Sequence, residues 1–184
     1  MNFNKHFELK DKHAFLSPSK YHWVNYDEAK LEENYSKYQA KEKGVRLHAH
    51  ACESILLGID LPKRNKTLNL YINDAIGFMM TPEQPLKYSD NCFGTADAIS
   101  FRKNMLRIHD FKSGETKSSM KQLEIYAALF CLEYDVNPND IQIELRIYQL
   151  DCVLIHNPDK EDILYIMQKI ISSDKHINEM KAEV

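Results

Sequence analysis

Two aspartates and a lysine in the middle of the chain have the types and spacing of a divalent-metal site. Asp97 lies inside an apolar stretch, where an unpaired charge is costly to bury, and Asp110 ends the next apolar stretch. Two carboxylates held close repel each other unless a cation lies between them, and Mg²⁺ and Mn²⁺ choose oxygen ligands of this kind. Lys112 shares the strand parity of Asp110 and could stabilise charge on a phosphate or an attacking water. The alternative is structural: Lys112 pairs with Asp110, and Asp97 caps a turn.

The elements that must position these residues are predicted from hydrophobic periodicity. Residues 93–101 and 105–111 read as strands, and the short polar segment between them predicts a hairpin that brings both acids to one end of the sheet. The other predicted elements are a helix over 27–58 with a break at Gly44 and a stop at Gly58, a strand over 67–72, a helix over 118–134, a turn over 137–140, a long strand over 141–154 and a helix over 161–171. This order predicts an α/β fold with a small mixed sheet flanked by helices.

Three segments in this order carry a resemblance to a known superfamily. "GTADAI", "IHDFKSG" and "QLEIYAALF" resemble the G-T-x-D strand, the D-x-K-[ST]-G strand and the Q-x-x-x-Y helix of PD-(D/E)XK nucleases. The RecB-like branch, which includes CRISPR-adaptation nucleases and many phage exonucleases, is the most similar. Upstream, "GVRLHAHACES" resembles the first motif of that branch, and "HAFLSPSKYHWVNY" resembles the opening of a phage and prophage group within it. The resemblance covers the chain to about residue 150 and implies a restriction-endonuclease-like core.

The resemblance implies a set of metal ligands for Mg²⁺ or Mn²⁺. Asp97 matches the acid of the second motif, and Asp110 matches the acid of the D-x-K motif. His48, four residues after Gly44, matches the histidine that adds a ligand in this branch. Phe111 would contribute only its backbone carbonyl.

The resemblance also implies catalytic and substrate-positioning residues. Lys112 matches the lysine of the D-x-K motif, and Gln122 and Tyr126 match the helix motif that positions the scissile phosphate and the lysine. Gln122 and Tyr126 are four residues apart and so share one face of a helix. Gly114 is expected to let the backbone approach the substrate.

The chain departs from the pattern of this branch in two places. The acid that usually follows the histidine by four residues is replaced by Cys52, and Glu53 lies one residue later, so Glu53 is a candidate ligand out of register, with His50 and Glu53 as an alternative pair. Relatives with an iron–sulfur cluster have a cysteine near the position of Tyr26, and this chain lacks that arrangement. We therefore expect no iron–sulfur cluster.

Composition sets the remaining expectations. The 184 residues predict one domain over 1–184, and the net charge of −3 excludes a protein that grips long nucleic acid by its overall charge. The densest basic patch, which could contact phosphate, contains Lys63, Arg64 and Lys66. No loop of the G-x-x-x-x-G-K-[ST] type is present, which argues against ATP as a cofactor. Neither a membrane-spanning run nor a signal peptide is found, so we expect no membrane partner and a cytoplasmic location.

The resemblance implies a metal-dependent deoxyribonuclease, with an exonuclease of phage DNA recombination, repair or processing as the expected role. Its partner is then DNA, single- or double-stranded, with a homo-oligomer or a phage recombination protein as further expected partners. The alternative is a nuclease-fold module with little or no turnover that binds DNA ends or a partner protein. An enzyme acting on RNA is a second alternative.

Overall fold

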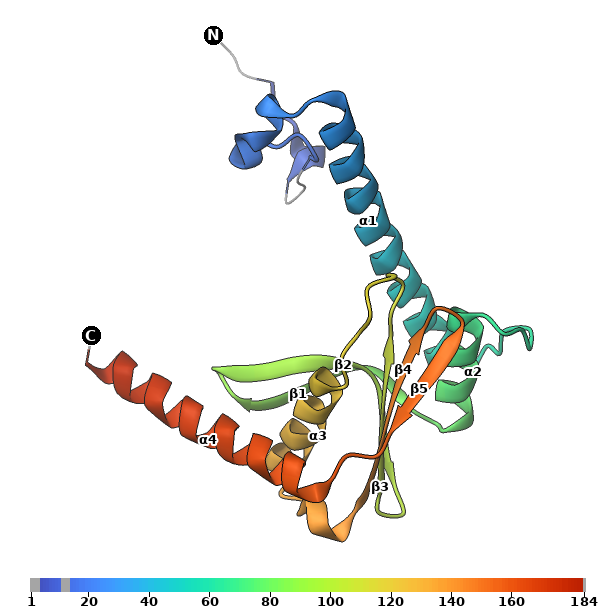
Figure 1. Cartoon of the computed structure of the whole chain (residues 1–184), viewed down its shortest axis with the longest axis vertical. Helices are drawn as coiled ribbons and strands as arrows, with labels where there is room; N and C mark the ends of the chain where they lie inside the picture. Colours follow the sequence, from blue (N-terminus) through green and yellow to red (C-terminus); the bar gives the residue numbers. More distant parts are fainter. Residues whose placement is uncertain (1–3, 11–13, 184) are drawn as a thin grey trace. The chain divides into compact units, whose positions relative to one another are not determined.

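The computed structural model describes residues 4–10 and 14–183. The chain divides into two compact units with the boundary between Val45 and Arg46. Every site residue predicted from the sequence lies in the second unit (Figure 1). Whether the two units form one domain over residues 1–184, as predicted from the length of the chain, stays a prediction. Among the described helices, none combines the length and the hydropathy needed to cross a bilayer.

The first unit consists of short 3₁₀ helices followed by the beginning of a long α-helix. Its elements are η1 (Phe7–Leu9), η2 (Pro18–Asn25) and the first part of α1 (Glu28–Leu57). Asp27 caps α1, since its carboxylate accepts a hydrogen bond of 2.8 Å from the backbone N–H of Lys30. Helix α1 continues through Gly44, so the expected break there is absent. A single glycine lowers helix propensity by about 1 kcal/mol but does not forbid helical backbone angles.

A five-stranded mixed sheet forms the centre of the second unit. The strand order is β1-β2-β3-β4-β5, and all neighbours are antiparallel except β3 and β4, which are parallel and are connected through α3. The strands are β1 (Thr81–Ser89), β2 (Cys92–Arg102), β3 (Met105–Phe111), β4 (Gln142–Gln149) and β5 (Cys152–His156). The α/β class and the mixed sheet predicted from the sequence are confirmed.

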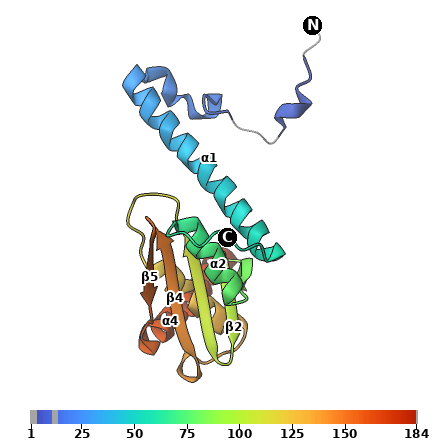
Figure 2. The same cartoon turned by 90° about the vertical axis from the view of Figure 1, so that its right-hand side faces the viewer.

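Helices cover both faces of this sheet. They are α2 (Thr67–Gly77), α3 (Lys121–Glu133) and α4 (Lys160–Ala182), together with the last turns of α1. One core lies between the sheet and α3 with α4, and the other lies between the sheet and α2 with the end of α1 (Figure 2). Strand β3 serves both cores by alternation: Leu106 and Ile108 belong to the first, and Phe111 belongs to the second.

The hairpin of β2 and β3 is confirmed. Lys103 and Asn104 form its tight turn with positive φ angles of 50° and 58°, the conformation that matches the twist of the flanking strands. The same turn geometry recurs at Leu150 and Asp151, where it divides the predicted long strand 141–154 into β4 and β5. The stop at Gly58, with φ of 64°, is also confirmed.

The strand predicted over 67–72 is wrong, because this segment begins helix α2. Its buried residues are Tyr71, Ile72 and Ala75, which recur at helical spacing only when the window extends beyond residue 72. Six apolar-rich residues cannot distinguish a strand from a buried helix. Asp151 helps to fix the start of α2, since its carboxylate accepts a 2.8 Å hydrogen bond from the backbone N–H of Thr67.

Strand β1 was not predicted. It contains Pro82 and Pro85, and proline within a run argues against a central strand because it cannot donate to the ladder. In the structure β1 is an edge strand with β2 as its one neighbour, where a missing N–H on the open side costs little. The missed strand matters because it carries an acidic residue into the site.

Candidate metal and catalytic site

Three acidic residues form one row across the first three strands of the sheet. Pro82 of β1 and His109 of β3 both pair with Ala98 of β2. The next position along each strand therefore places Glu83, Asp97 and Asp110 in one row. The hairpin predicted from the sequence brings Asp97 and Asp110 together as expected, and β1 adds Glu83.

Asp97 is largely buried, with a side chain that is 17% exposed. Burial, together with the negative charge of Asp110, raises the pKa of Asp97 to about 6. A hydrogen bond of 2.8 Å from the backbone N–H of Phe111 to Asp97 Oδ2 opposes this rise. The carboxylate is thus held in one position by a backbone hydrogen bond, while burial and the charge of Asp110 disfavour its ionised form. A cation bound beside it would stabilise that ionised form.

His48 reaches this row from α1. Its Nδ1 lies 3.6 Å from Asp97 Oδ2 and 4.0 Å from Glu83 Oε1, and its ring packs against Phe111 with centroids 5.2 Å apart. One potential ligand atom from each of His48, Glu83 and Asp97 lies within 4.8 Å of the other two. Imidazole and carboxylate donors gathered this closely suit a divalent ion.

Asp110 lies near the end of β3, and Lys112 directly follows this strand. Asp110 is 3% exposed, and its Oδ1 accepts a hydrogen bond of 2.9 Å from Lys112 Nζ. Its Oδ2 is buried and has no hydrogen-bond partner among the described residues. A buried carboxylate oxygen left unpaired is costly, although Asp110 is not among the three residues whose ligand atoms lie within 4.8 Å of one another.

Helix α3 contributes to the site from the face of the sheet opposite to the end of α1. Gln122 Oε1 accepts a hydrogen bond of 3.1 Å from Lys112 Nζ, so Lys112 is held between a carboxylate and an amide. The side chain of Gln122 is therefore engaged with Lys112.

Tyr126 lies one turn after Gln122 and packs closely against Gly94 of β2. A Cβ atom added to Gly94 would lie 2.9 Å from Tyr126 Cε1, so close that the tyrosine ring or the strand would have to shift. The glycine of the "GTAD" segment is thus required by the tyrosine of the helix. Two motifs recognised separately in the sequence are in direct contact.

Other predicted residues lie outside this group. Glu53 is exposed on α1 and is not among the three clustered ligands, while the thiol of Cys52 lies near Glu83, whose charge adds to burial in raising the thiol pKa. Gly114 is exposed in the loop after β3, and its carbonyl accepts a 2.7 Å hydrogen bond from the Gln149 side chain.

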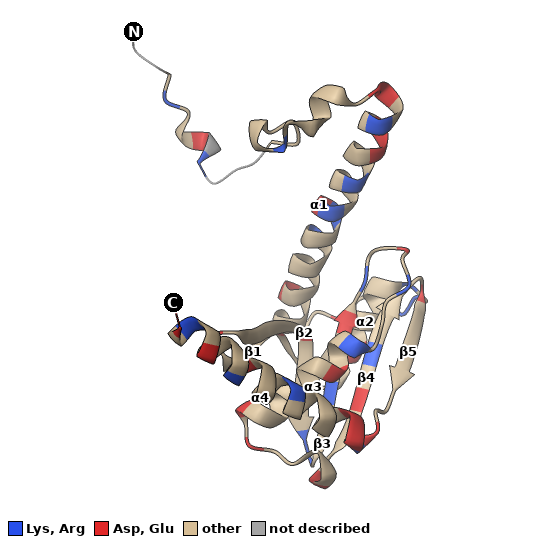
Figure 3. Cartoon of the chain, turned by 60° about the vertical axis from the view of Figure 1, so that its left-hand side comes forward, with Lys and Arg blue, Asp and Glu red and all other residues tan. Residues whose placement is uncertain are grey.

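The basic patch in the loop before α2 is only partly free. Lys63 and Arg64 are exposed, whereas Lys66 forms an ion pair of 2.7 Å with Asp151. Acidic and basic residues are interleaved along α1 (Figure 3). Contacts to phosphate from Lys63 and Arg64 stay a prediction.

Glu83 is the residue that sequence reasoning missed. Its φ angle of 48° is unusual for a non-glycine residue, and its side chain is 43% exposed beside His48. The available signal was an acid between two prolines, "PEQP", just ahead of the "GTAD" segment. Without a predicted strand there, nothing placed this acid opposite Asp97.

The residues present fit a divalent metal ion. The ligand set contains oxygen and imidazole donors, the pKa of Asp97 is raised by burial and by the charge of Asp110, and the buried Oδ2 of Asp110 lacks a partner among the described residues. For Phe111 the structure gives a different contact from the predicted one: its N–H donates to Asp97. A role for its carbonyl stays a prediction.

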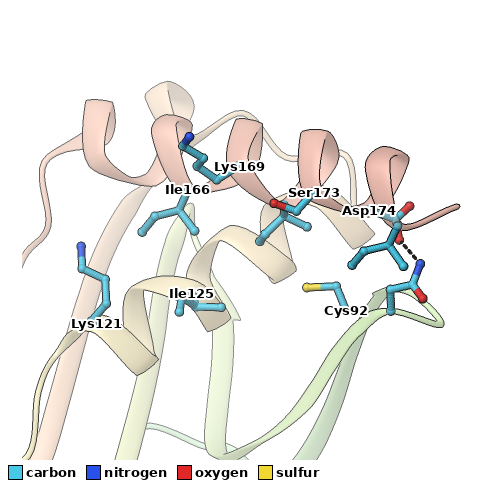
Figure 4. A pocket seen from close by; sticks show the side chains of 10 residues that line it. Cys92, Lys121, Ile125, Ile166, Lys169, Ser173 and Asp174 are labelled. Atoms are coloured by element: carbon cyan, nitrogen blue, oxygen red, sulfur yellow. Dashed lines mark hydrogen bonds between the residues drawn. The ribbon is translucent and has the colours of Figure 1, made fainter. Parts of the chain in front are cut away.

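An apolar cavity of about 390 Å³ lies elsewhere in the second unit, between α3, α4 and the turn of β1 and β2 (Figure 4). Isoleucine side chains from both helices line it, including Ile125, Ile166 and Ile170, and none of the predicted site residues does. It offers volume but no cluster of catalytic groups.

Comparisons of the chain with protein-family models, with curated proteins and with solved structures find no match. The site is therefore interpreted from its geometry and from the motifs in the sequence.

Proposed function

We propose that the chain is a metal-dependent nuclease of the PD-(D/E)XK type that hydrolyses phosphodiester bonds in DNA. The observation that carries the proposal is the acidic row of Glu83, Asp97 and Asp110, to which the described residues offer Lys112 and His48 as cationic partners. An excess of carboxylates at one buried point is costly unless a cation is bound there.

The architecture supports the finer assignment of a restriction-endonuclease-like core. The observed order α2, β1, β2, β3, α3, β4 repeats the predicted succession of a helix, three strands, a helix and a strand, with β1 in place of the strand wrongly predicted over 67–72. Asp97 and Asp110 lie on the second and third strands, Lys112 directly follows the third strand, and the Q-x-x-x-Y residues lie on the following helix. Sequence motifs and strand order thus point to the same fold.

The metal would be held by Asp97, Asp110, His48 and Glu83. When bound, a divalent ion supplies Lewis acidity to the phosphate and to the attacking water. Lys112 has a fixed position between Asp110 Oδ1 and Gln122 Oε1, so its ammonium group can orient the water and offset the charge that develops on the phosphate.

Gln122 and Tyr126 act by positioning. Gln122 holds Lys112 from the side of α3, and Tyr126 fixes the helix against β2 through its contact with Gly94. Preorganisation of this kind keeps the ammonium group in place without reorganisation during the reaction. Exonuclease action on phage DNA is the role we favour, by analogy with the branch that the motifs resemble.

The test is degradation of linear single- and double-stranded DNA with Mn²⁺, Mg²⁺ or EDTA. The parent protein is expected to cut only with a divalent ion, and Asp110→Ala is expected to lose cutting. Asp90→Ala is the matched control, because Asp90 has an 87% exposed side chain in the turn after β1. A parent protein that binds DNA but never cuts it with either ion would instead be a nuclease-fold binding module.

A further inference from the structure

The first unit contains a cavity of about 640 Å³ whose wall combines aromatic rings with lysines. The rings come from Phe15, Trp23, Tyr26 and Tyr38, and the ammonium groups come from Lys20 and Lys41. The volume is within the range of about 300–1,000 Å³ that is typical of small-molecule sites. All lining residues belong to residues 14–42, so the cavity is complete within this unit.

The aromatic rings around this cavity are not fully buried in a hydrophobic core. None of the eight residues of η2, which carries Trp23, is buried. The indole N–H of Trp23 already donates a hydrogen bond of 3.0 Å to the carbonyl of Ser17, so the remaining contact that this side chain offers is its ring. Tyr26 is likewise only half-buried.

Tyr38 forms a firm part of the wall. Its ring stacks on Tyr35 with an interplanar angle of 19° and packs against Phe15 with centroids 5.4 Å apart. Tyr35 and Tyr38 of α1 are thus held against each other, while Trp23 and Tyr26 are half-buried, with the Lys30 ammonium 5.1 Å from the centroid of the Tyr26 ring. A preformed aromatic wall of this kind can receive a planar ligand with little loss of side-chain entropy.

Polar groups in the same wall suit the other parts of a nucleotide. Lys20 and Lys41 can contact a phosphate, and the side-chain oxygens of Asn34 and Glu42 can accept hydrogen bonds from the edge of a base. The Asn34 amide nitrogen donates a 2.7 Å hydrogen bond to the carbonyl of Lys30, which fixes the orientation of the amide.

We propose that this cavity binds one unpaired nucleotide of a single-stranded DNA, with the base against the aromatic rings and a phosphate at Lys20 and Lys41. Aromatic faces combined with basic groups are the recurring means of holding single strands, because every base has a π-face and every link has a phosphate. A duplex hides its bases within its own stack and cannot enter. Only the choice of DNA as the strand rests on the nuclease proposal.

Binding is measured in EDTA, so that it is independent of cutting. A labelled twelve-residue thymidine oligonucleotide is titrated with the protein by fluorescence anisotropy, and the emission of Trp23, the only tryptophan, is followed in parallel. We expect saturable binding with quenching of Trp23, and at least tenfold weaker binding of a blunt duplex and of free thymidine monophosphate. Equal affinity for the duplex, or for the free nucleotide, would overturn the assignment to a single strand.

Two matched pairs of variants place the site. Lys20→Gln with Lys41→Gln is expected to weaken binding about tenfold and to reduce its salt dependence. Lys37→Gln with Lys43→Gln removes the same charge from α1 outside the cavity wall and is expected to leave binding within twofold. Similarly, Tyr26→Leu is expected to cost about tenfold, since stacking of one base is worth roughly 1–3 kcal/mol.

Tyr21→Leu is the control for Tyr26→Leu, because Tyr21 is 63% exposed and does not line the cavity. If both lysine pairs weaken binding equally, or if Tyr26→Leu binds as the parent does, the cavity is not the binding site. If the parent protein binds the single strand but does not cut DNA in the nuclease assay, the nuclease proposal is wrong and the strand-binding proposal stands.

Discussion

Two clusters of charged residues lie on the same sheet, and they are built in opposite ways. In the first, Arg107 and Arg146 donate to Glu144 at 3.1 and 3.0 Å, and Arg146 also pairs with Asp74 at 3.0 Å. Tyr148 adds a hydrogen bond of 2.7 Å to Asp74. Each acid in this cluster has a cationic partner at hydrogen-bonding distance.

In the second cluster, Glu83, Asp97 and Asp110 face a single lysine ammonium and the imidazole of His48. The pKa of Asp97 is raised to about 6, and the buried Oδ2 of Asp110 is unpaired within the described part of the chain. The difference shows that the number of cationic partners near buried acids indicates whether a cluster supports the fold or binds a ligand. A compensated cluster supports the fold, whereas an uncompensated one costs stability and implies a ligand that restores the balance.

The largest expected effect is that of Asp97→Asn. The substitution removes one carboxylate of the proposed metal site, so cutting in Mn²⁺ is expected to fall by about a thousandfold or more. The amide oxygen can still accept the hydrogen bond from the N–H of Phe111. The rate of degradation of linear DNA is the measurement.

The same variant is expected to be more stable than the parent at pH 8 in EDTA. The folded pKa of Asp97 is raised from 3.8 to about 6, so ionisation opposes folding, and the loss of stability develops as pH rises from about 4 through 6. The gain in the variant is at most about 3 kcal/mol. Urea unfolding at pH 4 and pH 8 checks it, and an equal difference at both pH values would contradict this account of the acidic row.

Arg146→Met tests the compensated cluster. It leaves Asp74 and Glu144 without this partner, and we expect the free energy of unfolding to fall by about 2–4 kcal/mol, measured in urea. Arg102→Met, at an exposed position on β2, is the control. The cutting rate per folded molecule should stay close to that of the parent, and a large loss of rate would mean that this cluster also serves the reaction.

Gly94→Ala tests the contact between β2 and α3. The added methyl group would meet the Tyr126 ring at 2.9 Å, so we expect a cost of about 1–3 kcal/mol in stability and a cutting rate about tenfold lower. Gly77→Ala is matched to it, since nothing lies within 4 Å of its added Cβ. Thermal unfolding and the nuclease assay together show whether the helix motif depends on this packing.

The smallest expected effect is stabilisation of the fold by the metal. At a free Mn²⁺ concentration ten times its dissociation constant, the parent should gain about 1.4 kcal/mol. Asp110→Asn should lose this gain, while Arg146→Met should keep it, because we propose that the ion binds at the acidic row. A gain of equal size in Asp110→Asn would place the ion elsewhere.

The hairpin, the helix motif and the α/β class could be predicted because their signals are local. Alternation over 93–101 and 105–111, with a short polar turn, defines β2, β3 and the neighbouring acids. In α3, Leu123, Ala127 and Cys131 recur at a spacing of four residues, which is helical spacing over several turns. These patterns depend on few residues at a time, so they can be read without knowing the rest of the fold.

The sequence by itself determined that Asp97, Asp110 and Lys112 would lie near one end of a hairpin, since chain connectivity and strand parity place them there. Only the tertiary structure decided that 67–72 is helical, that a proline-containing segment forms the edge strand, and that Glu83 completes the row with His48. The physical reason is that these outcomes depend on packing and register between segments far apart in the chain. Local propensity does not tell which residue of a neighbouring strand or helix a given side chain will face.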